Sequence, residues 1–366
     1  MLAGARTAQT VQARFAPPSA ARASVIVVNY NGGQALLCCI QSVLSSLEPG
    51  DELIVVDNAS TDGSADQLAA AWPQLRLLRS PGNGGFAAGN NLGAIHAIGD
   101  YLVFLNPDTV VTHGWLKALL VPLQGDPAIG LTTAKVLLLD RPDTINTCGN
   151  AVHLSGLTLC RGMGELRTAY SRQEDVTAVS GAAFAMRRDL FERLGGFDDT
   201  FFMYLEDTDL SWRARLAGWR CVFVPDSVVY HDYRLRIGPR KVFYQERNRY
   251  RLLLKNYRWP TLLALLPALA LAEVVTWGFV LVGDRAHLGN KLRAYADLLR
   301  CWPRLRLKHR QAQATRRVSD RELLREAEYR LGYAQTGHGL TARLAGALFD
   351  PAFWLLRELA MAVVWW

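Results

Sequence analysis

The sequence has few cysteines, and none of them forms a C-x-x-C pair. We interpret its six cysteines, of which Cys38 and Cys39 are adjacent, as reduced thiols of a cytosolic protein. A continuous apolar stretch is missing from the first 23 residues, which are rich in Ala, Arg, Pro and Gln. This absence argues against a secretory signal, so residues 1–23 are predicted to be a disordered leader.

Motifs for binding nucleic acid are also absent, although the chain is basic. The net charge is +8, and Arg and Lys dominate from Arg234 to Arg317. Such a stretch suits nucleic acid, acidic lipid head groups or phosphorylated substrates. Zinc-ligand spacing, a helix-turn-helix pattern and RNA-binding aromatic motifs are missing, so we expect no nucleic-acid partner.

Apolar runs alternate with helical spacing in the first part of the chain. Strands are predicted at 24–30, 52–56, 75–78 and 101–105, with helices at 34–47, 63–72 and 90–98. This alternation predicts an α/β fold with a mostly parallel sheet flanked by helices. Ligands of such sheets bind at the carboxyl ends of the strands. Those ends read NYNGG, DNAS, NGGFAAGNN and NPDT, all polar or glycine-rich.

Later elements are predicted from the same patterns. Strands are expected at 129–138 and 221–230, and a strand pair around a small-residue turn at 176–186. An acidic cluster within 201–218 leads into a helix. Beyond residue 244 the pattern becomes helical and basic.

Asp108 follows the strand 101–105 in the sequence Asn106-Pro107-Asp108-Thr109. A Pro-Asp turn would account for it, because Asp accepts backbone N–H bonds there. Alternatively, it binds Mg²⁺ or Mn²⁺, a cation that prefers carboxylate oxygen and takes its other ligands from phosphates and water. His231, at the end of strand 221–230, is either a surface histidine or a second ligand of that cation.

Three other loops at this edge could hold a nucleotide. Asp57 closes the second strand and either caps the next helix or accepts from the N–H edge of a pyrimidine base. The loop Asn29-Tyr30-Asn31-Gly32-Gly33 would let the backbone approach a nucleotide closely. The loop 82–87 matches G-x-G-x-x-A, a dinucleotide signature that offers an NAD(P)-type oxidoreductase as an alternative. That signature is weakened because the loop follows the third strand rather than the first.

Three carboxylates occur within four residues at Glu206, Asp207 and Asp209. They suit the N-terminus of a helix, whose dipole favours negative charge. They also suit a general base, because crowded carboxylates raise one another's proton affinity. Spacing alone does not decide which of the three would be the base. The small residues Val179-Ser180-Gly181-Ala182-Ala183 indicate either tight packing or a surface that an acceptor molecule approaches.

The series of motifs over residues 24–255 resembles the inverting glycosyltransferases of family 2, which have the GT-A fold. The matching segments, in family order, are VIVVNYNGG, VVDNASTDGS, GNGGFAAGNN, FLNPDT, VSGAAFAMRR, FFMYLEDTDLSWRARLAGW and VVYHDYR. The chain looks most similar to rhamnosyltransferase-type members that build bacterial cell-surface polysaccharides. Asn106-Pro107-Asp108 stands where many members have Asp-x-Asp, so the first acid is replaced by Asn.

The resemblance implies a role for each candidate residue. Asp207 would be the base that deprotonates the acceptor hydroxyl, and Asp108, helped by His231, would bind Mg²⁺ or Mn²⁺. The acceptor side would include Gly181, Ala182 and Glu206. The donor would be bound by Asn29, Tyr30, Asn31, Asp57, Asn83, Gly84, Asn90 and Asn106.

The resemblance also implies the substrates. The donor would be a nucleoside-diphosphate sugar, dTDP-rhamnose or a UDP-sugar, with rhamnose favoured. The acceptor would be a polyprenyl-diphosphate-linked or other membrane glycan. A non-catalytic protein that binds sugar nucleotides through the same fold is a further alternative.

The stretch 261–283 is apolar, carries the single charge Glu273 and is long enough to cross a bilayer. An acid in hydrocarbon is costly, and Pro267 would bend the helix. Because basic residues flank both ends, we favour a kinked, re-entrant or interface-lying helix over a span. The basic residues are Arg247, Arg249, Arg251, Lys255 and Arg258 before the stretch, and Arg285, Lys291 and Arg293 after it.

Two further C-terminal segments have the composition of membrane-surface helices. Residues 291–317 combine cations with helical Leu spacing, and 352–366 is rich in Trp. We therefore predict three regions: a leader at 1–23, a GT-A domain at 24–258 and a helical, basic, membrane-associating region at 259–366. The expected location is the cytoplasmic face of the inner or plasma membrane.

Overall fold

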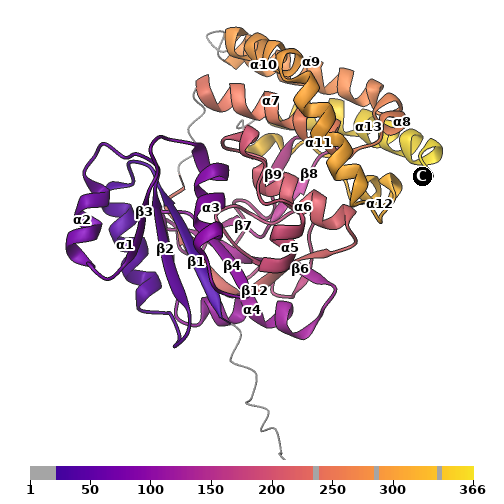
Figure 1. Ribbon diagram of the computed structural model, residues 1–366. Helices are drawn as coiled ribbons and strands as arrows, with labels where there is room; N and C mark the ends of the chain where they lie inside the picture. The colour runs from indigo at the N-terminus through magenta and orange to yellow at the C-terminus, as the bar shows by residue number, and fades with distance from the viewer. Residues whose placement is uncertain (1–21, 234–238, 284–287, 336–339) are drawn as a thin grey trace, which may run out of the picture.

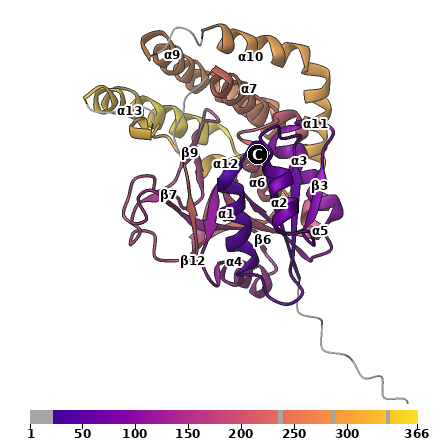
Figure 2. The ribbon, with the colours of Figure 1, turned by 90° about the vertical axis from the view of Figure 1, so that its left-hand side faces the viewer.

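The computed structural model describes residues 22–233, 239–283, 288–335 and 340–366. The predicted leader, except for its last two residues, lies outside these ranges, as does Arg285. Figures 1 and 2 show a twisted sheet flanked by helices, with the C-terminal helices gathered at the end of the sheet opposite the start of the first strand.

Four parallel strands form one side of the sheet, in the order β4-β1-β2-β3. Their apolar, largely β-branched runs are buried on both faces except in the short β3. The strands predicted in this region are confirmed, and helices α1 to α3 connect them as expected. The bounds are β1 (Ala23–Asn29), α1 (Gly33–Leu44), β2 (Glu52–Asp57), α2 (Ser64–Ala71), β3 (Arg76–Arg79), α3 (Gly85–His96) and β4 (Tyr101–Leu105).

Helix α3 begins at Gly85, five residues earlier than predicted, and this explains the glycine-rich loop. Gly85 has φ +79°, and a Cβ there would lie 2.2 Å from the carbonyl oxygen of Phe202. The glycine therefore lets the chain around Phe202 approach the start of the helix.

The other side of the sheet is mixed. Strand β11 (Ala183–Arg187) runs antiparallel to both β4 and β6 (Ile129–Leu138), while β12 (Arg220–His231) runs parallel to β6. Helix α4 (Trp115–Gly125) lies between β5 and β6 in the chain. The smaller strands of this sheet are β5 (Thr109–Val111), β7 (Ile145–Thr147) and β10 (Glu174–Asp175), and β8 (Asn150–Val152) pairs separately with β9 (Thr158–Cys160).

The strand pair predicted at 176–186 is wrong in its first half. Only β11 forms. Val176 and Ala178 donate to backbone carbonyls outside any strand pair, and the next three backbone N–H groups are bound by side chains. Val179 donates to Ser211 Oγ, Ser180 to Thr133 Oγ1 and Gly181 to Asp207 Oδ2. Side-chain oxygens can accept hydrogen bonds from backbone N–H groups in this way. The pattern of apolar residues in the sequence does not reveal such contacts.

The C-terminal part of the chain is helical, as predicted, but proline and tertiary contacts divide it further. The stretch 261–283 forms two helices that meet at Leu265, and 291–317 breaks at Cys301, just before Pro303. The described residues contain no helix that is both long and apolar enough to cross a membrane. The remaining helices are α5 (Arg188–Arg193), α6 (Glu206–Leu216), α7 (Pro239–Asn256), α8 (Trp259–Ala264), α9 (Leu266–Gly283), α10 (Leu288–Arg300), α11 (Trp302–Ala314), α12 (Asp320–Arg325) and α13 (Leu340–Val363).

The basic residues around 261–283 require a correction, because many of them are buried in ion pairs within the protein. Arg251 binds Asp297 at 2.7 Å, and Arg249 and Lys291 both bind Glu246 and Glu273. The acid at 273 is therefore neutralised inside the helical region. These cations stabilise the protein interior. Sequence composition alone did not distinguish such buried cations from those of a basic surface.

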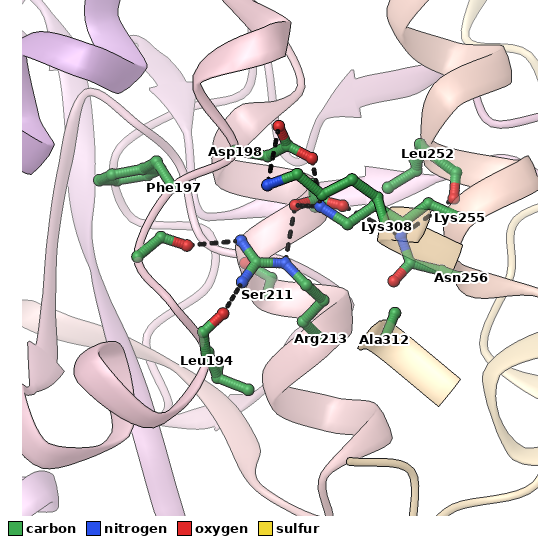
Figure 3. A network of polar contacts seen from close by, with 12 residues as sticks. Leu194, Phe197, Asp198, Ser211, Arg213, Leu252, Lys255, Asn256, Lys308 and Ala312 are labelled. Carbon is green, nitrogen blue, oxygen red and sulfur yellow. Dashed lines mark hydrogen bonds and ion pairs between the residues drawn. The ribbon is translucent and has the colours of Figure 1, made fainter. Parts of the chain in front are cut away.

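A buried polar network joins helix α6 to helix α7. Asp209 is fully buried, and its carboxylate accepts from Arg213 Nε (2.8 Å), Lys255 Nζ (2.8 Å) and Asn256 Nδ2 (3.1 Å). Lys255 also binds Asp198 Oδ2 at 2.7 Å. Figure 3 shows Asp198, Arg213 and Lys255 together within this network. Because every charge has a partner of opposite sign, the burial is tolerated.

Replacing Lys255 with Met should destabilise the protein by about 3–5 kcal/mol, because two buried carboxylates lose their shared cation. The free energy of unfolding would be measured in urea. Lys308→Met is the matched control, since Lys308 is less buried and lies 3.7 Å from Asp198. We expect the control to change the stability by about 1 kcal/mol or less. Equal stability of the two variants would contradict the importance of the network.

Candidate active site

One cavity of about 1050 Å³ lies between the carboxyl end of β4, the start of α6 and the C-terminal helices. Its size suits a substrate-binding site. It brings together candidates from distant parts of the sequence. The candidate residues that line it are Asn106, Asp108, Gly181, Ala182, Glu206, Asp207 and His231.

Asp207 is held in a defined orientation at the wall of this cavity. Its Oδ2 accepts from the Gly181 N–H at 2.7 Å and from Asn150 Nδ2 at 3.1 Å. Its Oδ1 accepts from the Thr208 N–H at 2.7 Å. A Cβ on residue 181 would lie 3.2 Å from this carboxylate, so the glycine allows the close approach.

The backbone before Asp207 adopts an unusual conformation. Tyr204 and Leu205 have φ values of +67° and +66°, in the left-handed region that non-glycine residues rarely occupy. This turn starts helix α6 at Glu206 and directs Glu206 and Asp207 to the cavity. Strain of this kind persists only where surrounding contacts enforce it, and it is common at active sites.

Glu206 and Asp207 form a coupled acid pair. Burial raises the pKa of Asp207, although the N–H groups of Gly181 and Thr208 oppose the shift. Burial, followed by repulsion from Asp207, raises the pKa of Glu206 well above its ordinary value. Glu206 Oε2 is buried and has no hydrogen-bond partner in the described part of the chain. The two acids therefore differ in environment: Asp207 accepts hydrogen bonds that favour its carboxylate, whereas Glu206 Oε2 lacks them.

Asp209 differs from its two neighbours in its environment. Contacts with Arg213 and Lys255 lower its pKa against the opposing effect of burial. It is fully buried, and it is not among the described residues that line the cavity. Of the three acids, Asp209 is thus committed to the network that joins α6 to α7.

Asp108 and His231 contact each other at another wall of the cavity. His231 Nε2 lies 3.1 Å from Asp108 Oδ1, and Nδ1 lies 2.9 Å from Asn146 Oδ1. The Asp108 side chain is 42% exposed, whereas His231 is buried. Both ring nitrogens face oxygens, and a neutral imidazole has only one N–H to offer.

This pair fits a divalent cation. Asp108 Oδ1 and His231 Nε2 lie 3.1 Å apart and could both hold one cation, and the carboxylate is the ligand type that Mg²⁺ or Mn²⁺ prefers. If His231 Nε2 binds a metal, Nδ1–H donates to Asn146 and both nitrogens are used. No group of three or more His, Cys, Asp or Glu side chains that could hold a metal was found among the described residues. A cation here would need further ligands from a substrate and water.

The donor-side candidates lie at the ends of β1 and β2, in the loops that follow them, in or near α3, and after β4. Asn29 and Asp57 are opposite each other in the register of β1 and β2, and both are buried. Asn29 Nδ2 donates to Asp57 Oδ1 at 3.0 Å and to two serines, so this pair ties the first two loops together. Tyr30 and Asn31 are exposed at the same edge.

The glycine-rich loop contributes three more candidates. Asn83 Oδ1 accepts from the Gly85 N–H at 2.9 Å, and Gly84 is the N-cap of α3. Asn90 is buried within α3, and its Oδ1 is unpaired in the part of the chain that the structure describes. Of the donor-side candidates, the described cavity lining includes Asn106. The donor-binding role of the others stays a prediction.

Two asparagines in the site were not predicted. Asn146 contacts His231 and Asn150 contacts Asp207, and both also line the cavity. They lie in or beside the short strands β7 and β8, in a stretch without a recognisable motif. Their partners are 85 and 57 residues away in the sequence, so no local pattern could have indicated them.

Comparison with known proteins gives a consistent family. The model for "Glycosyl transferase family 2" matches residues 24–195. The chain is 30% identical over 238 residues to the N-acetylglucosaminyl-diphospho-decaprenol L-rhamnosyltransferase of Mycobacterium tuberculosis, covering 57% of this chain and 75% of that protein. It is 27% identical over 230 residues to the pre-mycofactocin glycosyltransferase of the same species, covering 62% of this chain and 47% of that protein.

Solved structures share the fold. GalNAc-T7, crystallised with UDP, GalNAc and Mn²⁺, superposes with a TM-score of 0.55 at 21% identity, covering 65% of this chain and 48% of that chain. S. aureus TarS 1–349, in complex with UDP-GlcNAc, gives 0.53 at 16% identity and covers 94% of this chain and 93% of that chain. The predicted α/β fold of the GT-A type is thereby confirmed, with a sheet that is parallel on one side and mixed on the other.

Replacing Glu206 with Gln should remove a pH-dependent loss of stability. A carboxyl group whose pKa is raised by folding stabilises the protein below its unfolded pKa and loses that contribution as pH rises through the folded pKa. The free energy of unfolding of the wild type should therefore fall as pH rises above about 4.3. Glu206→Gln should lack that fall, so at pH 8 it should be more stable than the wild type by on the order of 1 kcal/mol. Thermal unfolding from pH 5 to 9 would measure it. The exposed Glu48→Gln is the control, and identical pH profiles of both variants would contradict the buried acid.

Proposed function

The chain belongs to glycosyltransferase family 2, and we propose that it transfers a sugar, with inversion, from a nucleoside-diphosphate sugar to a membrane-bound glycan acceptor. One observation carries this proposal: a single cavity contains both the oriented carboxylate of Asp207 and the Asp108–His231 pair. Inverting transfer needs a base on one side of the sugar and stabilisation of the leaving diphosphate on the other.

Asp207 acts as the general base in this proposal. The contacts with Gly181 and Asn150 hold Oδ2 in place, and the raised pKa brings the carboxylate closer to the proton affinity that base catalysis favours. Asp207 removes the proton of the acceptor hydroxyl while that oxygen attacks the anomeric carbon. The bond from that carbon to the diphosphate breaks on the opposite face, so one displacement inverts the configuration without an enzyme-linked intermediate.

Asp108 and His231 would hold Mg²⁺ or Mn²⁺. When bound, such an ion stabilises the charge that develops on the departing diphosphate. Asn146 orients His231 through Nδ1 and leaves Nε2 free for the ion. The Mn²⁺ and UDP in the related GalNAc-T7 structure support this assignment.

For the donor, we favour dTDP-rhamnose over a UDP-sugar. The support is the similarity to a relative named as an L-rhamnosyltransferase, of which the chain covers 75%. The loops that contain Asn31 and Asp57 would bind the nucleoside, and Asn83 and Asn106 would line the donor pocket. The name of that relative also includes a decaprenol-linked acceptor, which supports a polyprenyl-diphosphate glycan here.

Membrane association at the cytoplasmic face is the part of the proposal that concerns location. Helix α13 has a row of exposed apolar residues along one side, here called the apolar stripe, and Trp365, near the C-terminus, is 76% exposed. Such a stripe favours an interface with a membrane surface. The exposed residues of the stripe are Leu344, Leu348, Leu355, Leu359 and Val363.

Asp207→Asn should abolish transfer while leaving the fold and donor binding intact. General-base catalysis is typically worth about 10²–10⁴-fold in rate, and the amide preserves the shape of the side chain. A panel of nucleotide sugars would be assayed for hydrolysis and for transfer to a membrane lipid extract, with thermal unfolding as the check on folding. Activity within about tenfold of the wild type would assign the base elsewhere. No turnover of any sugar nucleotide by the wild type would contradict the proposed function.

Removal of divalent metal should stop transfer. EDTA is expected to abolish activity, and added Mg²⁺ or Mn²⁺ to restore it, because the leaving diphosphate loses its counter-charge. Asp108→Asn and His231→Gln should weaken Mn²⁺ binding measured by calorimetry in the presence of UDP. Full activity in chelator would leave Asp108 as a turn residue, and unchanged Mn²⁺ affinity in both variants would contradict this site.

A further inference from the structure

The cavity continues well beyond the groups that the proposed reaction needs. From Asp207 it extends between helices α9 and α13, where its walls become apolar. The donor chemistry described above uses none of these walls. The apolar arm is lined by Val274, Gly278 and Phe279 of α9 and by Ala342, Ala345 and Phe349 of α13.

Small residues keep this apolar arm open. A Cβ placed on Gly278 would meet no heavy atom of the described residues within 4 Å. Ala342 and Ala345 lie on one face of α13, three residues apart, and contribute only methyl groups. The cavity as a whole reaches about 1050 Å³, at the upper end of typical ligand pockets.

Three cationic side chains line the cavity as well, Lys241, Arg249 and Lys291, and the last two are paired with Glu246 and Glu273. Lys241 has no carboxylate partner among the described residues, and its ammonium lies 5.6 Å from the centre of the Tyr204 ring. Arg249 is fully buried, and its Nε–H has no acceptor in the described part of the chain. A buried, unused N–H on an arginine is unfavourable unless a ligand accepts from it.

The two faces of α13 differ in what they contact. Ala342, Ala345 and Phe349 line the cavity, whereas Leu344 and Leu348 are exposed and belong to the stripe assigned above to a membrane surface. The apolar arm and that surface therefore lie on different faces of the same helix. A molecule in the arm would have its polar end near Asp207 and its apolar part between α9 and α13.

We propose that the apolar arm binds the polyprenyl chain of a lipid-diphosphate acceptor, with its diphosphate near Lys241 and Arg249 and its sugar directed to Asp207. The inference rests on the proposed function, and it names where the lipid part of that acceptor lies. An isoprenoid chain matches the apolar walls. The diphosphate matches the Lys241 ammonium by charge, and it could accept from the unused Arg249 Nε–H.

The test is the binding of geranylgeranyl diphosphate in detergent, measured by calorimetry with the full chain. Gly278→Leu fills the apolar arm and should weaken binding about tenfold or more, because the leucine side chain takes the space of an apolar branched unit of the isoprenoid chain. The matched control is Gly289→Leu in α10, which also adds a side chain in open space but does not line the cavity as described. The control should bind like the wild type.

Two additional comparisons make the test independent of folding problems. Ala345→Leu fills the arm from the opposite helix and should weaken binding similarly. Lys241→Gln should weaken binding of the lipid diphosphate but leave binding of geranylgeraniol unchanged. Wild-type affinity in both arm-filling variants, or equally tight binding of inorganic diphosphate and the lipid, would overturn the inference.

Failure of this inference is distinguishable from failure of the proposed function. Lipid binding that Gly278→Leu weakens, without any sugar transfer by the wild type, would contradict the proposed transfer and support the lipid site. Sugar transfer by the wild type, with the same lipid affinity in Gly278→Leu and Gly289→Leu, would support the transferase and contradict the lipid site.

Discussion

The buried carboxylate of Asp209 is the contact on which the rest of the site depends. It binds Arg213 within α6 and Lys255 and Asn256 on α7, so the first turn of α6 is fixed against the C-terminal helices. The cavity lies between these elements. Its walls keep their separation because an ion network of this kind tolerates little displacement once it is buried.

The acids of α6 show how one helix turn gives the same chemical group different properties. Asp207 and Asp209 are two residues apart and thus point about 200° apart around the helix. Asp209 meets cations, which lower its pKa, whereas Asp207 and Glu206 reach the cavity, where burial raises theirs. Local environment, and not residue type, divides structural from candidate catalytic carboxylates.

The C-terminal helices provide both cohesion and an apolar surface. Glu273 is bound by Arg249, Lys291, Tyr250 and Tyr295, so the single acid of an apolar helix lies among its partners in the protein. With that charge neutralised internally, α9 can present apolar residues to the cavity. The exposed stripe of α13 lies on the other side of the same layer. The membrane and lipid proposals both depend on this division of faces.

The sequence by itself determined the family and most elements of the parallel side of the sheet. Buried apolar runs predicted β4 (Tyr101–Leu105) and β6 (Ile129–Leu138) with their observed bounds, because strand character depends on neighbouring residues. The ordered motifs also indicated which loops would meet at the carboxyl ends of the parallel strands. Tertiary structure alone decided which acid faces the cavity, the contacts of Asn150 and the ion pairs of the basic residues. These depend on partners far away in the chain, such as Asp209 and Lys255, 46 residues apart, and periodicity carries no record of such pairings.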